Sequence, residues 1–330
     1  MQKKVLYGGI LSLAITIISL IAITRPTYEF PRNSAGPEIQ IEIASGESGW
    51  SIARQLEKNG VIMRASKFAA LAAQDKRALS ISPGTHRVQT HITTKDALTQ
   101  LLDQTRLGTP DVVVEGSTYS DVLKVLAADS NIVTDKKVVM PALKNPKNSL
   151  EGQLFPATYT FASGTSRSTA LQAMVRNFEE RTRALGLEKG YGSFTAYQVL
   201  TIASMVQIEG DPSDYAKVAG VIYNRLKIGM PLQLNSTVQY AADLRGRIFL
   251  STQATKIDSP YNTYKHVGLP PTPISNPSFQ ALKASLNPQA HNYLYFITVK
   301  PRDTRFTADY SEFGRWVEEY NKNLAAGKFK

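Results

Sequence analysis

One glutamate stands where its side chain could transfer a proton. Residues 197–210, YQVLTIASMVQIEG, are typical of a helix because they lack proline, follow the N-cap candidates Ser193 and Thr195, and end in a glycine. The residues at i−3, i−4 and i−7 from Glu209 share its helical face and are all apolar: Val206, Met205 and Ile202. Burial on such a face raises the pKa of a carboxyl, which a general acid working near neutral pH requires.

The same spacing fits a second interpretation, in which Glu209 ends its helix at the rim of the core with its carboxylate in water. Spacing alone favours this second interpretation, because rim carboxylates are common and catalytic ones are rare. Competing chemistries are easier to exclude. The chain has no cysteine, so thiolate catalysis, disulfides and Cys-based metal sites are ruled out, and its four histidines form no HExxH pair. We therefore expect no zinc or other metal site and no cofactor.

The charge balance indicates the kind of partner. With 330 residues, a hydrophobic fraction of 42% and a net charge of +11, the chain is long enough for packed domains and is strongly basic. Nucleic acid, anionic lipid and an anionic polymer such as a cell wall would all attract it. A predicted membrane anchor argues against nucleic acid.

That anchor is an uncharged run at the N-terminus. Residues 5–24 follow a basic tail, residues 1–4, and are about as long as a helix needs to cross the hydrocarbon core of a bilayer. The basic tail predicts a cytoplasmic N-terminus, with the bulk of the chain outside. A cleaved signal peptide is the alternative, but the run is longer than an h-region and lacks an A-x-A-like site. We expect an uncleaved single-pass membrane anchor.

Beyond a tether at residues 25–38, the pattern of elements predicts an α+β fold in two parts. Residues 39–105 are expected to form one small module. It begins with an alternating strand, turns at Gly46 into a helix that carries Ile52 and Leu56, and continues through two more helices and a short strand. This arrangement resembles a LysM module, which implies binding to N-acetylated glycans. Gly116, Val122 and Leu126 repeat the spacing of Gly46, Ile52 and Leu56 further on.

Residues 106–330 are expected to form the larger α+β domain. Helices are predicted at 168–185, 218–226 and 311–324, an extended entry at 151–161, and a central strand at 293–299. Two segments, 231–240 and 259–264, read as loops dense in amides, hydroxyls and aromatic rings. Sugars offer many hydroxyls and flat apolar faces, so the following residues are candidates for binding them, although ordinary turn chemistry and packing fit as well: Gln233, Asn235, Tyr261, Asn262 and Tyr264.

Six segments together resemble one known family over nearly the whole chain. In order they are EGQLFPATY (151–159), ASMVQIE (203–209), NRLKIGMPLQ (224–233), SPYNTY (259–264), GLPPTPI (268–274) and YLYF (293–296). They are similar to the YceG-like family of endolytic murein transglycosylases, whose catalytic glutamate falls on Glu209. The resemblance reverses the balance between the two interpretations of that residue.

The chain departs from the family pattern in three places. The family's Glu-x-Glu reads Gln207-Ile208-Glu209, its Gln-x-Asp reads Gln233-Leu234-Asn235, and a histidine of the C-terminal helix is replaced at about Phe313. Because Gln207 replaces the first glutamate, Glu209 is left as the single candidate acid. Because Asn235 replaces the aspartate, a charged partner for the acid is not expected at position 235. The third leaves the C-terminal helix without an assigned chemical role.

The resemblance implies a membrane-anchored lytic transglycosylase, a carbon–oxygen lyase acting on peptidoglycan. Such an enzyme cleaves the MurNAc-β-1,4-GlcNAc bond of nascent strands without water and leaves 1,6-anhydroMurNAc ends, with Glu209 as acid and then base. One carboxylate suffices for that reaction, whereas hydrolysis usually takes two. A muramidase that hydrolyses the same bond and a non-catalytic wall-binding or division scaffold are the alternatives. Cell-wall synthesis or division proteins would be its protein partners.

Overall fold

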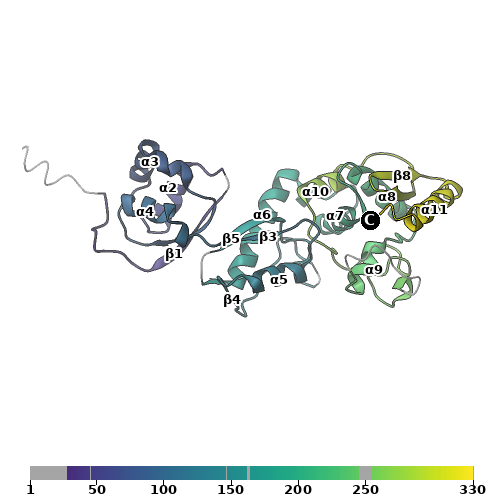
Figure 1. Ribbon diagram of the computed structural model, residues 1–330, viewed down its shortest axis with the longest axis horizontal. Helices are drawn as coiled ribbons and strands as arrows, with labels where there is room; N and C mark the ends of the chain where they lie inside the picture. Colours follow the sequence, from purple (N-terminus) through teal and green to yellow (C-terminus); the bar gives the residue numbers. More distant parts are fainter. Residues whose placement is uncertain (1–27, 45, 146, 162–163, 245–253, 330) are drawn as a thin grey trace, which may run out of the picture. The chain divides into compact units, whose positions relative to one another are not determined.

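The computed structural model describes residues 28–329 except 45, 146, 162–163 and 245–253, and it confirms a mixed α+β fold. Figure 1 shows two compact units, the first of residues up to Gly108 with 160–162, the second of 109–159 and 163–330. The expected membrane span at 5–24 and the first three residues of the tether, 25–27, lie outside the described residues. Within the described part, no helix has the length and apolar character needed to cross a bilayer.

The first unit packs three helices against an antiparallel pair of strands. β1 and β2 pair with Ile39 opposite Val88 and Ile41 opposite His86. Ile41, Leu56 and Phe68 lie in the core that this pair and the helices enclose. Its elements are β1 (Glu38–Ile43), α2 (Gly49–Lys58), α3 (Ala65–Gln74), η1 (Lys76–Ser80), β2 (Gly84–Gln89), α4 (Thr94–Leu102) and η2 (Gln104–Arg106).

The repeated glycines adopt the same backbone conformation in the two units. Gly46 has φ 76° and Gly116 has φ 80°, a left-handed region that L side chains rarely occupy. Ser48 and Thr118 then cap the helices that follow, each with a side-chain oxygen accepting a backbone N–H. The strand–turn–helix spacing predicted from the sequence is therefore a local folding unit that the chain uses twice.

The second unit is mostly helical, with small sheets at its edges. β3 pairs with β5, β4 with β6, and β7 with β8. Its elements are β3 (Thr109–Val113), α5 (Tyr119–Ala128), β4 (Ile132–Val133), β5 (Ala157–Phe161), β6 (Thr165–Ser166), α6 (Arg167–Leu185), η3 (Leu187–Lys189), α7 (Ala196–Glu209), α8 (Tyr215–Lys227), α9 (Asn235–Ala241), η4 (Ala254–Lys256), α10 (Phe279–Leu286), β7 (Tyr295–Lys300), β8 (Asp303–Thr307) and α11 (Tyr310–Ala325).

Two sequence-based expectations were wrong in this unit. Residues 231–240 are not all loop, because α9 begins at Asn235 and buries Ser236, Thr237 and Val238. Segment 293–299 is not a central strand, because β7 has β8 as its sole strand partner in the described sheets. Both errors arose from the composition: Asn, Ser and Thr suit turns and short helices alike, and an apolar aromatic run does not reveal how many strands flank it.

Helix α7 runs through the centre of the second unit. Thr195 caps it and forms a capping box with Gln198, which selects Thr195 over Ser193 as the N-cap. Residues 199–206 are all buried, as expected of a helix that is surrounded on every side. α8 and α10 pack against it, so the end of α7 is held in a fixed position.

A carboxyl pair lies between β3 and α5. Asp111 is 7% exposed, and its carboxyl is hydrogen-bonded to that of Asp129, just beyond the end of α5. Burial, followed by the nearby Asp129 charge, raises the pKa of Asp111 to about 7. A folded-state pKa above the unfolded value means that the folded protein binds more protons between about pH 4 and pH 7. Stability is therefore lost as the pH rises through that window.

We predict that Asp111→Asn becomes progressively more stable than the original chain between pH 5 and pH 8. The amide still donates a hydrogen bond to Asp129 but cannot ionise, so the expected gain at pH 8 over pH 5 is about 1–2 kcal/mol. Urea unfolding at the two pH values measures it. Asp258→Asn, at an exposed aspartate, is the matched control. An equal effect of Asp111→Asn at both pH values would contradict the raised pKa.

Candidate active site

Glu209 closes the last turn of α7, on the face that the sequence predicted. Ile202, Met205 and Val206 are completely buried in one hydrophobic cluster with residues of α8 and α10. The Glu209 side chain itself is half-buried, so it is enclosed by protein yet retains a path to solvent. It therefore matches neither a sealed core carboxyl nor a freely solvated rim residue.

The Glu209 carboxyl is held by the start of α9. The backbone N–H of Ser236 donates to Glu209 Oε1 at 3.0 Å. Burial raises the pKa of Glu209, while the contacts with Ser236 and the positive charge of Arg225 oppose part of that rise. The net direction is upward, as a group that must hold and release a proton near neutral pH requires.

Arg225 is a buried cation near this carboxyl. It is 7% exposed, and its guanidinium donates to the carbonyl of Leu294 at 2.6 Å and to that of Leu232 at 2.5 Å. Burial lowers the pKa of Arg225, and the neighbouring Glu209 carboxylate acts in the opposite direction. Since Leu232 precedes α9 and Leu294 precedes β7, Arg225 ties both segments to α8 and keeps a fixed positive charge beside the acid.

A second enclosed carboxylate, Glu151, holds the other end of α9. It is 4% exposed, and its oxygens accept from the backbone N–H of Tyr119 and from the hydroxyl of Tyr240, both at 3.0 Å. Tyr240 belongs to α9, as Ser236 does. This short helix is therefore bound by Glu209 at its beginning and by Glu151 near its end.

Three of the five predicted sugar-binding residues lie around α9. Gln233 and Asn235 have exposed side chains, and the Tyr264 hydroxyl donates to Asn235 Oδ1 at 2.7 Å. Burial raises the pKa of Tyr264, and the Glu209 charge adds to that rise, which places the phenol within electrostatic reach of the acid. Asn235 and Tyr264 thus lie near Glu209, beside the Ser236 N–H that bonds it, and Gln233 precedes α9 with an exposed side chain.

Tyr261 and Asn262 are engaged inside the protein. Tyr261 Oη lies 2.9 Å from Thr272 Oγ1, and its ring packs against Tyr240. Asn262 is fully buried, and its amide nitrogen donates to the carbonyls of Thr255 and Ile257. These side chains shape the loop that carries Tyr264.

The sequence reasoning missed three contributors to the site. Arg225 had a usable signal, since an arginine inside an otherwise apolar helix must find partners for its charge. Glu151 was noticed only as part of a motif. Ser236 acts through its backbone N–H, and a pattern of side chains in the sequence does not predict a backbone hydrogen bond. Within the described ranges, no group of three or more His, Asp or Glu residues is arranged to hold a metal ion.

The arrangement can donate one proton and take one back. The acid is enclosed, has a raised pKa, is aimed by a backbone N–H and lies beside a fixed cation. The amides of Gln233 and Asn235 are exposed and are chemically able to hydrogen-bond to a polar substrate. Such a site suits general acid–base catalysis on a substrate rich in hydroxyl groups.

Comparisons with known proteins agree with one another. The sequence profile of the YceG-like family matches residues 41–319. An endolytic murein transglycosylase of Bacillus subtilis is 32% identical over 310 residues, 86% of this chain and 84% of its own length. One of Streptococcus pneumoniae is 28% identical over 300 residues, 78% of this chain and 54% of its own length. A crystal structure of a putative YceG-like protein from Listeria monocytogenes has a TM-score of 0.53, with 26% identity over 84% of this chain and 98% of that one.

Proposed function

Because the chain belongs to the YceG-like family, we propose that it is a lytic transglycosylase that cleaves the glycan strands of peptidoglycan. The observation that carries the proposal is Glu209, an enclosed carboxyl with a raised pKa at the end of α7. The relatives named as endolytic murein transglycosylases support it, since the alignment with the Bacillus subtilis protein covers most of both chains.

Glu209 serves in both steps of the reaction. Its carboxyl protonates O4 of the GlcNAc leaving group as the bond from that oxygen to C1 of MurNAc breaks. The 6-hydroxyl of the same MurNAc then bonds to C1 and gives its proton to the Glu209 carboxylate. The product is a 1,6-anhydro ring, no water is consumed, and Glu209 regains its initial protonation state.

The surroundings of Glu209 fit these two roles. Desolvation favours the protonated carboxyl before bond cleavage, and the Ser236 N–H with Arg225 stabilises the carboxylate that forms afterwards. Positive charge develops at C1 in the transition state, and the amide dipole of Asn235, oriented by the Tyr264 hydroxyl, can stabilise it; Gln233 is the second candidate. Tyr264 positions Asn235 through its hydroxyl.

Glu209→Gln is expected to fold normally and to lose activity by at least ~10²-fold, because the amide keeps the shape but cannot exchange a proton. Release of muropeptides from sacculi, weighed by mass spectrometry, measures it. Gln207→Glu is the control, since Gln207 lies two residues before Glu209 on another face of α7, and its side chain accepts from the N–H of Ser278, which a glutamate also does. Its activity should stay close to the original.

Other results of this assay would contradict the proposal, and each would indicate a different function or a different acid. Anhydro-muropeptides released by Glu209→Gln near the original rate would mean that another group is the acid. Products heavier by one water would identify a muramidase, and no release by the unmodified chain would favour a wall-binding scaffold.

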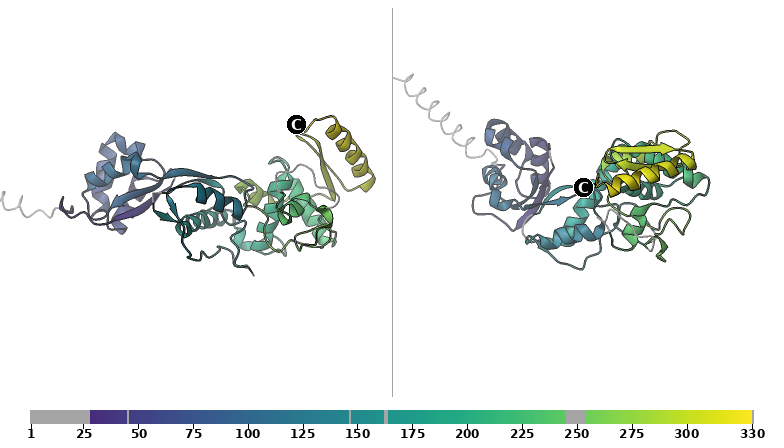
Figure 2. Two further views of the ribbon diagram at one scale, coloured as in Figure 1. Left: turned by 60° about the horizontal axis from the view of Figure 1, so that its bottom comes forward. Right: turned by 45° about the vertical axis from the view of Figure 1, so that its right-hand side comes forward.

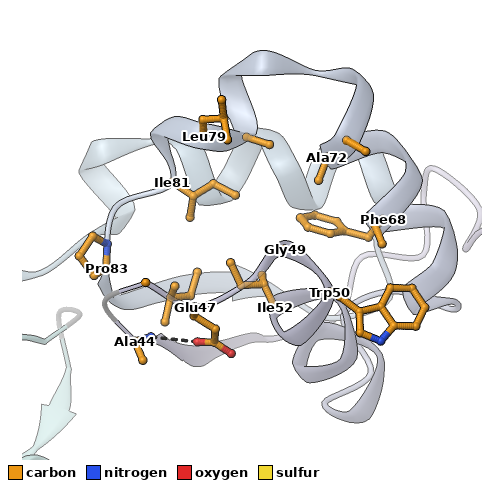
Figure 3. Close-up of a pocket in the computed structure, with 15 residues that line it drawn as sticks. Ala44, Glu47, Gly49, Trp50, Ile52, Phe68, Ala72, Leu79, Ile81 and Pro83 are labelled. Atoms are coloured by element: carbon orange, nitrogen blue, oxygen red, sulfur yellow. Dashed lines mark hydrogen bonds between the residues drawn. The ribbon is translucent and has the colours of Figure 1, made fainter.

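The first unit is proposed to bind glycan as a LysM-like module. A pocket of about 550 Å³ opens between the β1–α2 turn and the α3–β2 segment, and Figure 3 shows Trp50, Phe68, Ile81 and Pro83 around it. Trp50 is 48% exposed, so its indole is free to stack on a sugar face. Glu47 shapes the turn by accepting from the N–H of Ala44.

Trp50→Ala should weaken binding of the soluble chain to sacculi by about 3–10-fold, the worth of one aromatic stacking contact. Met63→Ala is the control, because Met63 is similarly exposed in this unit and does not line the pocket. Pelleting with sacculi measures both, and deletion of residues 39–105 should weaken pelleting further. Unchanged pelleting of Trp50→Ala and of the deletion would refute the module's role.

Residues 5–24 are proposed to anchor the enzyme in the bacterial cell membrane, with the N-terminus in the cytoplasm and the two units outside. The support is the uncharged run itself and the absence of a cleavage motif. Mass spectrometry of protein extracted from membranes should find an N-terminus at or next to Met1. A mature N-terminus near residue 25 would overturn the anchor.

A further inference from the structure

Three aromatic rings gather where α11 meets β7. The Tyr295 ring lies 5.3 Å from that of Phe313, nearly parallel to it, and 5.5 Å from that of Tyr310. Tyr310 and Phe313 are 6.3 Å apart, centroid to centroid. Both views in Figure 2 show α11 running along the β7–β8 hairpin, so two elements of secondary structure hold the three rings in place. We call Tyr295, Tyr310 and Phe313 the aromatic platform.

The platform is more exposed than the packing of a hairpin against a helix requires. Tyr310 is 69% exposed, and Tyr295 and Phe313 are only partly buried. Along α11, Asn323 is the only side chain that is fully buried, although the helix carries several aromatic residues. A helix that only stabilised the hairpin would bury its aromatic face. Large exposed aromatic groups, by contrast, are typical of a binding surface.

The platform is connected to the site around Glu209 through Arg225. The Arg225 guanidinium carbon lies 5.5 Å from the centroid of the Tyr295 ring. The same guanidinium bonds Leu294, next to Tyr295 in the chain, and interacts electrostatically with Glu209 and Tyr264. One buried cation therefore lies between the acid and the Tyr295 ring, and the other two rings of the platform pack against that ring.

We propose that the aromatic platform is a glycan subsite that binds sugars of the same strand beyond the bond being cleaved. Pyranose rings offer flat apolar faces, which stack on aromatic rings, while the Tyr295 and Tyr310 hydroxyls can hydrogen-bond to their hydroxyl groups. The proposal deepens the function proposed above and rests on it. An enzyme that must engage a strand away from its ends gains from contacts several sugars distant from its acid, because each added contact favours long strands over short ones.

The test measures binding without turnover. In the Glu209→Gln background, we would titrate purified glycan strands fractionated by length, and a tetrasaccharide, into the protein with and without Tyr310→Ala. Tyr310→Ala should weaken binding of long strands by about 3–10-fold, the worth of one stacking contact, and leave the tetrasaccharide unchanged. Since binding is the readout, failure of Glu209 as the acid would appear in the activity assay and leave this comparison intact.

Two controls accompany the test. Tyr310→Phe keeps the ring and should bind long strands nearly as well as the unmodified platform. Phe279→Ala removes a partly exposed aromatic ring from α10 in the same unit and should change neither affinity. Thermal unfolding of each variant confirms that it is folded.

Three outcomes would overturn the subsite. They are unchanged affinity for long strands in Tyr310→Ala, an equal loss for the tetrasaccharide and long strands, and a change of oligomeric state in light scattering. The last would assign the platform to self-association.

Discussion

The hydrogen bond from the Ser236 N–H to Glu209 is the interaction on which the candidate site depends. It joins the end of a helix enclosed by the core to the beginning of a short surface helix. Without it, burial would be opposed only by the positive charge of Arg225, and the carboxyl would give up its proton less readily to the leaving group. Together with the charge of Arg225, this N–H stabilises the carboxylate during the part of the reaction in which Glu209 is ionised.

Helix α9 is too short to be stable by itself, since helices below about 12 residues are marginal in water. Its position depends on contacts made from outside: Glu209 and Glu151 hold it by carboxylates, and Thr263 by its carbonyl and hydroxyl, which accept from the N–H groups of Gln233 and Leu234. The residues that hold α9 come from distant parts of the sequence. The geometry of the acid is therefore a property of the whole second unit.

Much of the local structure could be predicted from the sequence because it depends on interactions between residues that are close together in the chain. The helix containing Glu209, a cap at Ser193 or Thr195 and the apolar face with Met205 all follow from spacing within one segment, and the capping box with Gln198 then identifies Thr195. What could not be predicted requires contacts between segments. Asn262 has the amide side chain expected of a residue that binds a sugar, yet its amide nitrogen donates to two backbone carbonyls of its own loop. No pattern indicates that the backbone of Ser236 meets Glu209, 27 positions away.

The glycine that follows Glu209 has a role that its backbone angles do not explain. Gly210 ends α7 with φ −122°, a conformation open to any residue, so left-handed geometry is not the reason for glycine here. A Cβ atom at this position would lie 3.2 Å from both Tyr215 and Val218, at the start of α8. The absence of a side chain at Gly210 therefore allows α8 to pack close to the end of α7, directly after Glu209. Any larger residue here would require Tyr215 and Val218 to shift by a few tenths of an ångström, so the close approach of α8 to the end of α7 depends on this glycine.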